Sequence, residues 1–143
     1  ELALLRGERD AAAAAFAQAS ALRPHSSLPR TMTTLYGATP PDPAWIAQRI
    51  AGLSGYVATG AGGWPDDQIE IALLELARGD KPAAIAALRG AIAAGFLDRA
   101  YLQTSALFRP LADEPAFAAL VETIAERVNA ERTRAAPLVA AEQ

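Results

Sequence analysis

The chain has 143 residues, enough for one domain with a hydrophobic core, and 36 of them are alanine, which supplies about half of the 52% apolar residues. Because alanine is the strongest helix former and brings little area to bury, this composition predicts an all-α fold in which helices approach closely. The net charge of −3 argues against a nucleic-acid partner, which needs clustered Lys and Arg, and the absence of cysteine excludes disulfides and thiolate metal sites.

The longest uncharged run, residues 50–65, has 16 residues of which five are glycine, whereas a bilayer requires about 20 apolar residues. No membrane insertion is therefore expected. The first residues, Glu1 and Leu2, carry neither an initiator Met nor a signal segment, and we expect the chain to be the C-terminal piece of a longer protein. Cysteine usage leaves the compartment open between cytoplasm, which is favoured, and periplasm.

Residues 1–24 have the pattern of a truncated helical hairpin. Residues 1–6 are expected to end a first helix, Gly7 to form the turn, and residues 8–22 to form a partner helix. This second helix should stop at Arg23, because a proline disfavours helical geometry in the residue before it. Small and large apolar residues follow Gly7 at offsets of +5, +9, +12 and +17, namely Ala12, Phe16, Ala19 and Pro24.

Residues 25–65 match this pattern only by position. A repeat of about 34 residues predicts a turn near residue 41, where the sequence is Thr39-Pro40-Pro41-Asp42-Pro43. The same offsets then fall on Ile46, Ile50, Leu53 and Ala58, which indicates a degenerate repeat. Because Ile46 and Leu53 stand where alanines would allow close approach, this hairpin should pack loosely or splay. The segment Gly60-Ala61-Gly62-Gly63 is expected to be a flexible elbow.

Residues 66–95 predict the most regular hairpin. Asp66 and Asp67 should start a helix with Ile69, Leu73 and Leu76 on one face, ending at Gly79. Asp80 is expected to cap a second helix, with Pro82 in its first turn and an apolar stripe formed by Ile85, Leu88 and Ile92. The offsets from Gly79 repeat those from Gly7 and fall on Ala84, Leu88, Ala91 and Phe96.

The last part of the chain predicts a capping segment over residues 96–136 and a frayed tail over residues 137–143. Its final helix is amphipathic, and its apolar residues share one face: Phe117, Leu120, Val121, Ile124 and Val128.

The matched offsets after Gly7 and Gly79 resemble those of the tetratricopeptide repeat (TPR) family. The closing segment is similar to the tail of TPR arrays in bacterial multidomain proteins, including winged-helix regulators and nucleotide cyclases. The resemblance covers residues 1–24 and 66–128, and residues 25–65 only by offset. It implies antiparallel hairpins stacked as a short right-handed solenoid with a C-terminal capping helix, forming a single domain over residues 1–136 whose concave groove binds a protein or peptide.

Residues that could carry a reaction are few. His25 is the only histidine, which excludes a His-based metal site, and we expect it to be an exposed loop residue. The serines Ser26, Ser27 and Ser54 have no oriented base apart from this neighbouring histidine. The glycines at 60–63 lack the Lys and Ser/Thr of a P-loop, and the acids Asp66, Asp67 and Glu70 fall within one helical turn, as at a helix start. We therefore predict no catalytic, cofactor or metal site and no enzyme.

The favoured function is a non-catalytic protein–protein interaction or scaffold domain. Candidate partner-binding residues are Gln68, Glu75 and Arg78 on the first helix of the regular hairpin, together with three aromatic residues, Trp45, Tyr56 and Trp64. For these aromatics, core packing is the favoured interpretation and interface anchoring the alternative. The alternative function is an accessory or self-association domain of a multidomain enzyme, a cyclase or hydrolase, with the catalytic domain upstream. Homo-oligomerisation through apolar Leu2, Leu4 and Leu5 also stays open.

Overall fold

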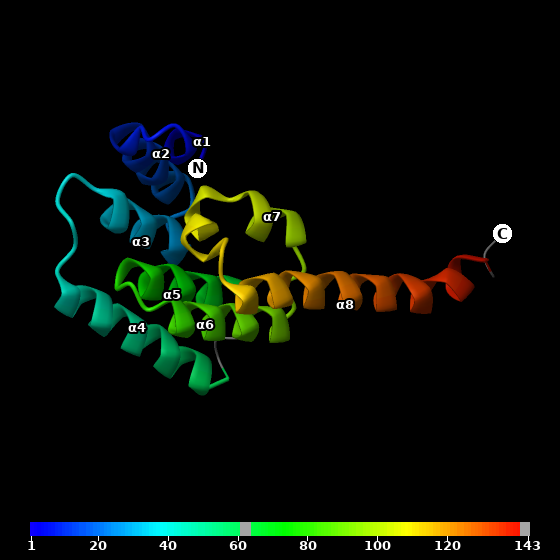
Figure 1. Cartoon of the computed structure of the whole chain (residues 1–143). Coiled ribbons are helices and arrows are strands. Elements are labelled where there is room, and N and C mark those ends of the chain that lie inside the picture. Colours follow the sequence, from blue (N-terminus) through cyan, green and yellow to red (C-terminus); the bar gives the residue numbers. More distant parts are fainter. Residues whose placement is uncertain (61–63, 141–143) are drawn as a thin grey trace.

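The fold is all-helical, as the composition predicts. The computed structural model describes residues 1–60 and 64–140, with side chains to residue 135, and these ranges contain helices and no strand (Figure 1). The helices are α1 (Leu2–Leu5), α2 (Arg9–Leu22), α3 (Ser27–Tyr36), α4 (Pro43–Ala58), α5 (Pro65–Ala77), α6 (Lys81–Ala93), α7 (Arg99–Thr104), the 3-10 helix η1 (Ala106–Leu111) and α8 (Pro115–Ala140).

Glycines end three of these helices, and two of them are the predicted turns. Gly7, Gly79 and Gly95 have φ angles of 76°, 80° and 104°, a left-handed conformation that costs glycine little. The Gly79 amide donates to the Leu76 carbonyl at 3.0 Å, and the next amide donates to the Glu75 carbonyl at 2.9 Å. The other two glycines make the same pair of bonds, which satisfy carbonyls that a helix end leaves free.

Aspartate side chains cap the beginnings of α6 and α4. The Asp80 carboxylate accepts from the Ala83 amide at 2.9 Å, and Pro82 stands in the first turn of α6, as predicted. The Asp42 carboxylate accepts from the Ala44 amide at 2.8 Å and starts α4 directly after the proline-rich segment. The predicted turn at residues 39–43 is therefore the connection between α3 and α4.

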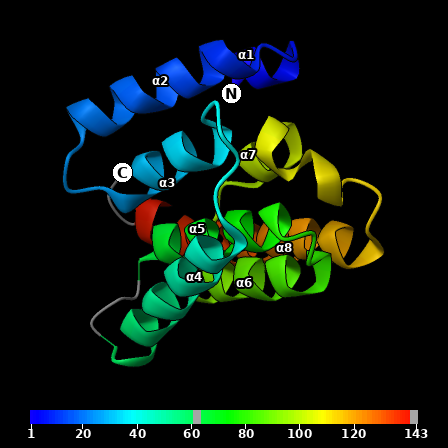
Figure 2. The ribbon, with the colours of Figure 1, turned by 90° about the vertical axis from the view of Figure 1, so that its left-hand side faces the viewer.

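The core centres on α5 and α6, which run side by side through the middle of the molecule (Figure 2). The small residues Ala84 and Ala91 are fully buried on α6, and so is Leu88 between them. These positions are the ones that the repeat offsets select. The chain's alanines thus allow the close helix approach that the composition predicts.

The middle helices splay, as expected from the bulk of Ile46 and Leu53. α3 packs most closely on α2, and α4 packs on α5, whereas α3 and α4 make no comparable contact with each other. Ile46 and Leu53 are buried, with 5% and 6% of their surface exposed. Of the predicted elbow, residues 61–63 lie outside the described residues; Gly60, with φ of 70°, follows the last turn of α4.

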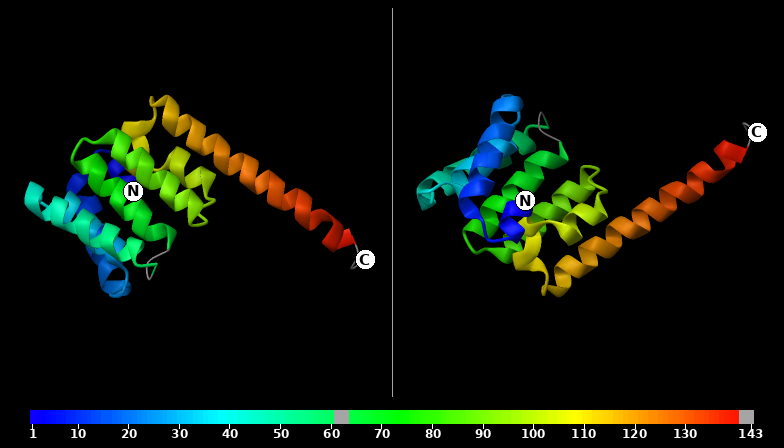
Figure 3. Two further views of the ribbon diagram at one scale, coloured as in Figure 1. Left: turned by 90° about the horizontal axis from the view of Figure 1, so that it is seen from below. Right: turned by 90° about the horizontal axis from the view of Figure 1, so that it is seen from above.

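The C-terminal part closes the core and then leaves it. Phe117 and Ile124 on α8 are buried, and the Arg127 guanidinium donates to the Ile92 carbonyl at the end of α6. Residues 129–135 are exposed, and this part of the helix extends away from the other helices (Figure 3). The sequence predicts a frayed tail from residue 137, but α8 includes Pro137 and continues to Ala140.

Candidate functional site

An apolar cavity of about 630 Å³ lies between α3, α5, the start of α4 and η1. We call it the apolar groove. Its floor consists of buried residues: Met32, Leu35, Ile46, Leu73 and Leu107. Its walls are more exposed and include four prolines from the α3–α4 connection, the start of α4 and η1: Pro40, Pro41, Pro43 and Pro110.

The 3-10 helix η1 forms one side of this groove because it lies against both α1 and α5. Its residues Phe108 and Leu111 are 1% and 0% exposed and belong to the core, whereas Leu107 and Pro110 of the same helix line the groove. The open space of the groove is bounded by α3 and the second half of α5.

Positive charge stands at the rim of the apolar groove. The Arg9 guanidinium donates to the Leu35 carbonyl at 3.1 Å and lies 5.6 Å from the centre of the Tyr36 ring. Burial raises the pKa of Tyr36, an effect that Arg9 partly offsets, so the phenol stays protonated at neutral pH. Arg78 lies 3.2 Å from Glu75 Oε2, which is buried and accepts no hydrogen bond from it. The rim therefore carries two guanidinium groups and one buried carboxylate.

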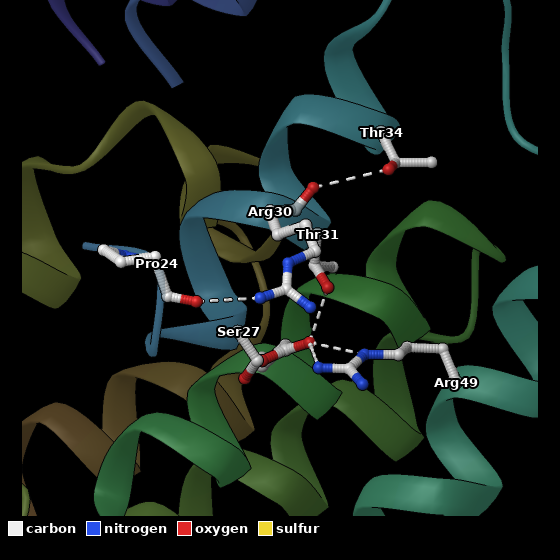
Figure 4. A network of polar contacts seen from close by, with 7 residues as sticks. Pro24, Ser27, Arg30, Thr31, Thr34 and Arg49 are labelled. Atoms are coloured by element: carbon white, nitrogen blue, oxygen red, sulfur yellow. Dashed lines mark hydrogen bonds and ion pairs between the residues drawn. The ribbon is translucent and has the colours of Figure 1, made fainter. Parts of the chain in front are cut away.

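A buried carboxylate joins three helices near the N-terminal end of α3 (Figure 4). Glu70 on α5 is 0% exposed and accepts from the hydroxyls of Ser27 and Thr31 on α3, both at 2.5 Å. The Arg49 guanidinium on α4 donates to the same carboxylate, with N–O distances of 2.8 and 2.7 Å. Glu70 is thus one member of a structural ion pair with Arg49. The acids in the first turn of α5 are Asp66 and Asp67, and the interpretation that Glu70 belongs with them is wrong.

A second cavity of about 510 Å³ opens beside this ion pair, at the end of α4 and the beginning of α5. We call it the polar cavity. The side chains that line it with chemically distinct groups are His25, Ser27, Arg49, Tyr56, Trp64 and Asp67. Burial raises the pKa of Asp67, and the nearby carboxylates of Glu70 and Asp66 raise it further, against a smaller opposing effect of Arg49.

The polar cavity does not assemble a nucleophile and a base in the described residues. The Ser27 hydroxyl donates to Glu70, and no hydrogen bond joins His25 to Ser27 or to Asp67. His25 is exposed, as predicted. Across residues 1–60 and 64–135, no group of three His, Asp or Glu side chains is arranged to hold a metal ion.

The six predicted partner-binding residues fall in different places. Tyr56 and Trp64 are 48% and 74% exposed and line the polar cavity, whereas Trp45 is half-buried and lines a shallow depression on α4 with Arg49.

The other three lie on α5 or at its end, and only one of them reaches a cavity. Arg78 lines the apolar groove, whereas Glu75 does not line it and is buried, with 7% of its surface exposed. Gln68 packs against α6 at Gly90, where an added Cβ would lie 2.8 Å from the amide oxygen. Gln68 and Glu75 thus support the helix packing of this region.

The sequence alone did not indicate the proline wall of the apolar groove or the partners of Glu70. Pro40, Pro41 and Pro43 have the sequence pattern of a turn, and Arg49 has that of an ordinary charged residue on a helix. The prolines reach the groove, and Arg49 reaches Glu70, only through the packing of α4 on α5.

Comparison with protein-family models, with curated protein sequences and with solved structures finds no match for this chain. None of the helices within the described ranges is long and apolar enough to cross a lipid bilayer.

Proposed function

We propose that this chain is a non-catalytic interaction domain whose apolar groove binds a peptide segment of another protein. The observation that carries this proposal is the groove of about 630 Å³, with an apolar floor and two arginines at its rim. Ligand sites in proteins are typically concave, mostly apolar and equipped with a few polar groups that fix orientation.

The walls of the groove favour binding because they are already rigid. Prolines have a fixed φ angle, so the segment of residues 40–43 loses little conformational freedom when a ligand binds. The expected ligand has a large apolar side chain for the floor and a carboxylate next to it, because the residues that line the groove include two arginines, Arg9 and Arg78, and no carboxylate.

The TPR resemblance agrees with this proposal and gives the helices their order. The helix ends at Gly7 and Gly79 and the hairpin of α5 and α6 have the form that the repeat implies. In a repeat array the first helix of each hairpin faces the ligand, and α5, the first helix of the α5–α6 hairpin, lines the groove together with α3.

A peptide array or peptide display selection with the isolated chain tests this function, with one variant and one matched control. Ala77→Lys places a long charged side chain in the groove, at an exposed position on α5, so the fold should tolerate it. Ala86→Lys makes the same change at an exposed position on α6 that does not line the groove.

We expect the selected peptides to bind Ala77→Lys at least about tenfold more weakly than the wild type, because lysine cannot be buried among apolar side chains without a partner. The control should bind like the wild type. If no peptide binds above background, or if both variants bind alike, the groove is not the binding site.

A second candidate function, self-association, is favoured by the exposed leucines of α1. Leu2 and Leu5 are 61% and 47% exposed, although leucine is usually buried. Sedimentation at two concentrations tests it: a concentration-dependent increase in mass supports an accessory or self-association role beside an enzymatic domain, and a strictly monomeric profile rejects it.

A further inference from the structure

The polar cavity presents two exposed aromatic rings at one opening. Tyr56 comes from the last turn of α4 and Trp64 from the residue before α5, with 48% and 74% of their surfaces exposed. Rings of this size are normally packed in the core or at an interface. Exposed aromatic faces attract cations, because the negative face of the ring quadrupole points toward them.

A carboxylate lines the same cavity and lacks a partner. Asp67 stands in the first turn of α5, and its Oδ2 atom is buried without a hydrogen bond. Burial raises the pKa of Asp67, which means that its charged form is poorly compensated in this position. Asp67 as a whole is partly exposed and lines the cavity, so a cation there would approach the carboxylate from its open side and compensate its charge.

The remaining charges of the cavity leave Asp67 as the one that needs a counterion. The Arg49 guanidinium also lines the cavity, but it is paired with the Glu70 carboxylate at 2.7 Å. This pair carries no net charge. With histidine counted as neutral, as in the formal charge of the chain, the side chains that line the cavity sum to one negative charge, that of Asp67.

We propose that the polar cavity binds a cationic side chain, arginine or lysine, of a protein partner. The guanidinium or ammonium group would lie against Asp67, and its aliphatic stem would cover the rings of Tyr56 and Trp64. This function goes beyond the apolar groove, because the two sites lie at opposite ends of α4 and α5. The groove is lined by the start of α4 and the end of α5, and the cavity by the end of α4 and the start of α5.

The test is an NMR titration of the full chain with Nα-acetyl-arginine methylamide in mildly alkaline buffer, where a free imidazole is neutral. The chain contains two tryptophans, so the indole N–H signal of Trp64 reports on the cavity and that of Trp45 serves as an internal reference. The matching uncharged probe is Nα-acetyl-citrulline methylamide, and free guanidinium ion is the second comparison.

We expect a saturable shift of the Trp64 signal with a millimolar Kd and no saturable shift with the citrulline probe. Asp67→Asn should weaken binding about fivefold or more, because it removes a partly exposed ion pair. Tyr56→Ala should weaken binding by a similar factor, because it removes a partly exposed cation–π contact. Asp66→Asn removes the same charge one residue away, at an exposed position that does not line the cavity, and should weaken binding less than Asp67→Asn because this charge acts only from a distance.

Four results would overturn the proposal. The first is the absence of a saturable Trp64 shift, the second is equal binding of the citrulline probe, and the third is an equal effect of the two asparagine variants. The fourth is binding of free guanidinium as tight as that of the arginine probe, which would assign the cavity to a small organic cation. None of these results affects the apolar groove, whose peptide binding is measured with Ala77→Lys.

Discussion

Removing the guanidinium of Arg49 should show how much the buried ion pair contributes to the fold. Arg49→Met keeps a long apolar stem but leaves the Glu70 carboxylate, which is 0% exposed, with only the hydroxyls of Ser27 and Thr31. Losing one partner of a buried pair typically costs about 3–5 kcal/mol. Because the Arg49 side chain is 33% exposed, part of its interaction is screened by water, and we expect a loss of about 2–4 kcal/mol.

The matched control is Arg99→Met. Arg99 pairs with Glu122 at 3.0 Å, but the two side chains are 44% and 65% exposed, and such surface pairs contribute less than about 1 kcal/mol. The double variant Arg49→Met/Glu70→Gln supplies the complementary test. A neutral amide needs no counterion, so the double variant should regain at least about 1 kcal/mol relative to Arg49→Met.

Urea unfolding followed by far-UV circular dichroism measures these differences, with the midpoint shift compared at constant m-value. The reasoning would be refuted if the Arg49 and Arg99 variants lost the same stability, or if the double variant were no more stable than Arg49→Met.

Three further predictions concern the helix ends, the core and the polar cavity. Gly79→Ala should cost about 1–2 kcal/mol because φ is 80° there, whereas Gly55→Ala, in open space on α4, should be neutral or stabilising by up to about 1 kcal/mol; thermal melts compare the two. Leu88→Ala should cost about 2–5 kcal/mol in urea unfolding, because Leu88 is 0% exposed, and a loss below about 1 kcal/mol would mean that the core around α6 is loosely packed. Burial and two nearby carboxylates raise the pKa of Asp67 in the folded state above its unfolded value, so the folded state binds the carboxyl proton more tightly. Ionisation of Asp67 therefore lowers the free energy of unfolding as the pH rises from the unfolded pKa through the folded pKa. The unfolding free energy of Asp67→Asn relative to wild type should therefore increase between about pH 3 and neutral pH, and a flat difference would contradict the assigned shift.

The sequence predicts the helix ends and the core stripes well because these are local properties. Gly79 and Asp80 stop one helix and cap the next through atoms a few residues away, so their roles depend little on the rest of the fold. Ala84 and Ala91 are likewise selected by helical spacing, and both are fully buried.

The arrangement of the helices and the two cavities depends on contacts that no local pattern encodes. Glu70 follows two aspartates and has the sequence pattern of a helix start, yet its partners on α3 and α4 make it a buried residue. In the same way, the position of η1 against α1 joins segments about a hundred residues apart.

For the candidate site, the sequence favours core packing of the three aromatics, which is wrong for Tyr56 and Trp64, and it does not indicate their neighbours in the cavity. The loosely packed middle repeat leaves Tyr56 and Trp64 exposed, and both line one cavity with Asp67. The prediction that Glu75 faces a groove is wrong, because this polar residue is buried, with 7% of its surface exposed, and does not line the groove.

The most direct test of the proposed function is methyl NMR of the chain in complex with a peptide selected by display. The methyl groups of Met32, Ile46 and Leu73 report from the floor of the apolar groove, and that of Ile124 reports from the buried face of α8. A ligand in the groove should shift the first three strongly and leave Ile124 unchanged. If the strongest shifts lie on α8, or if the three floor residues do not respond, the peptide binds elsewhere and the groove is not its site.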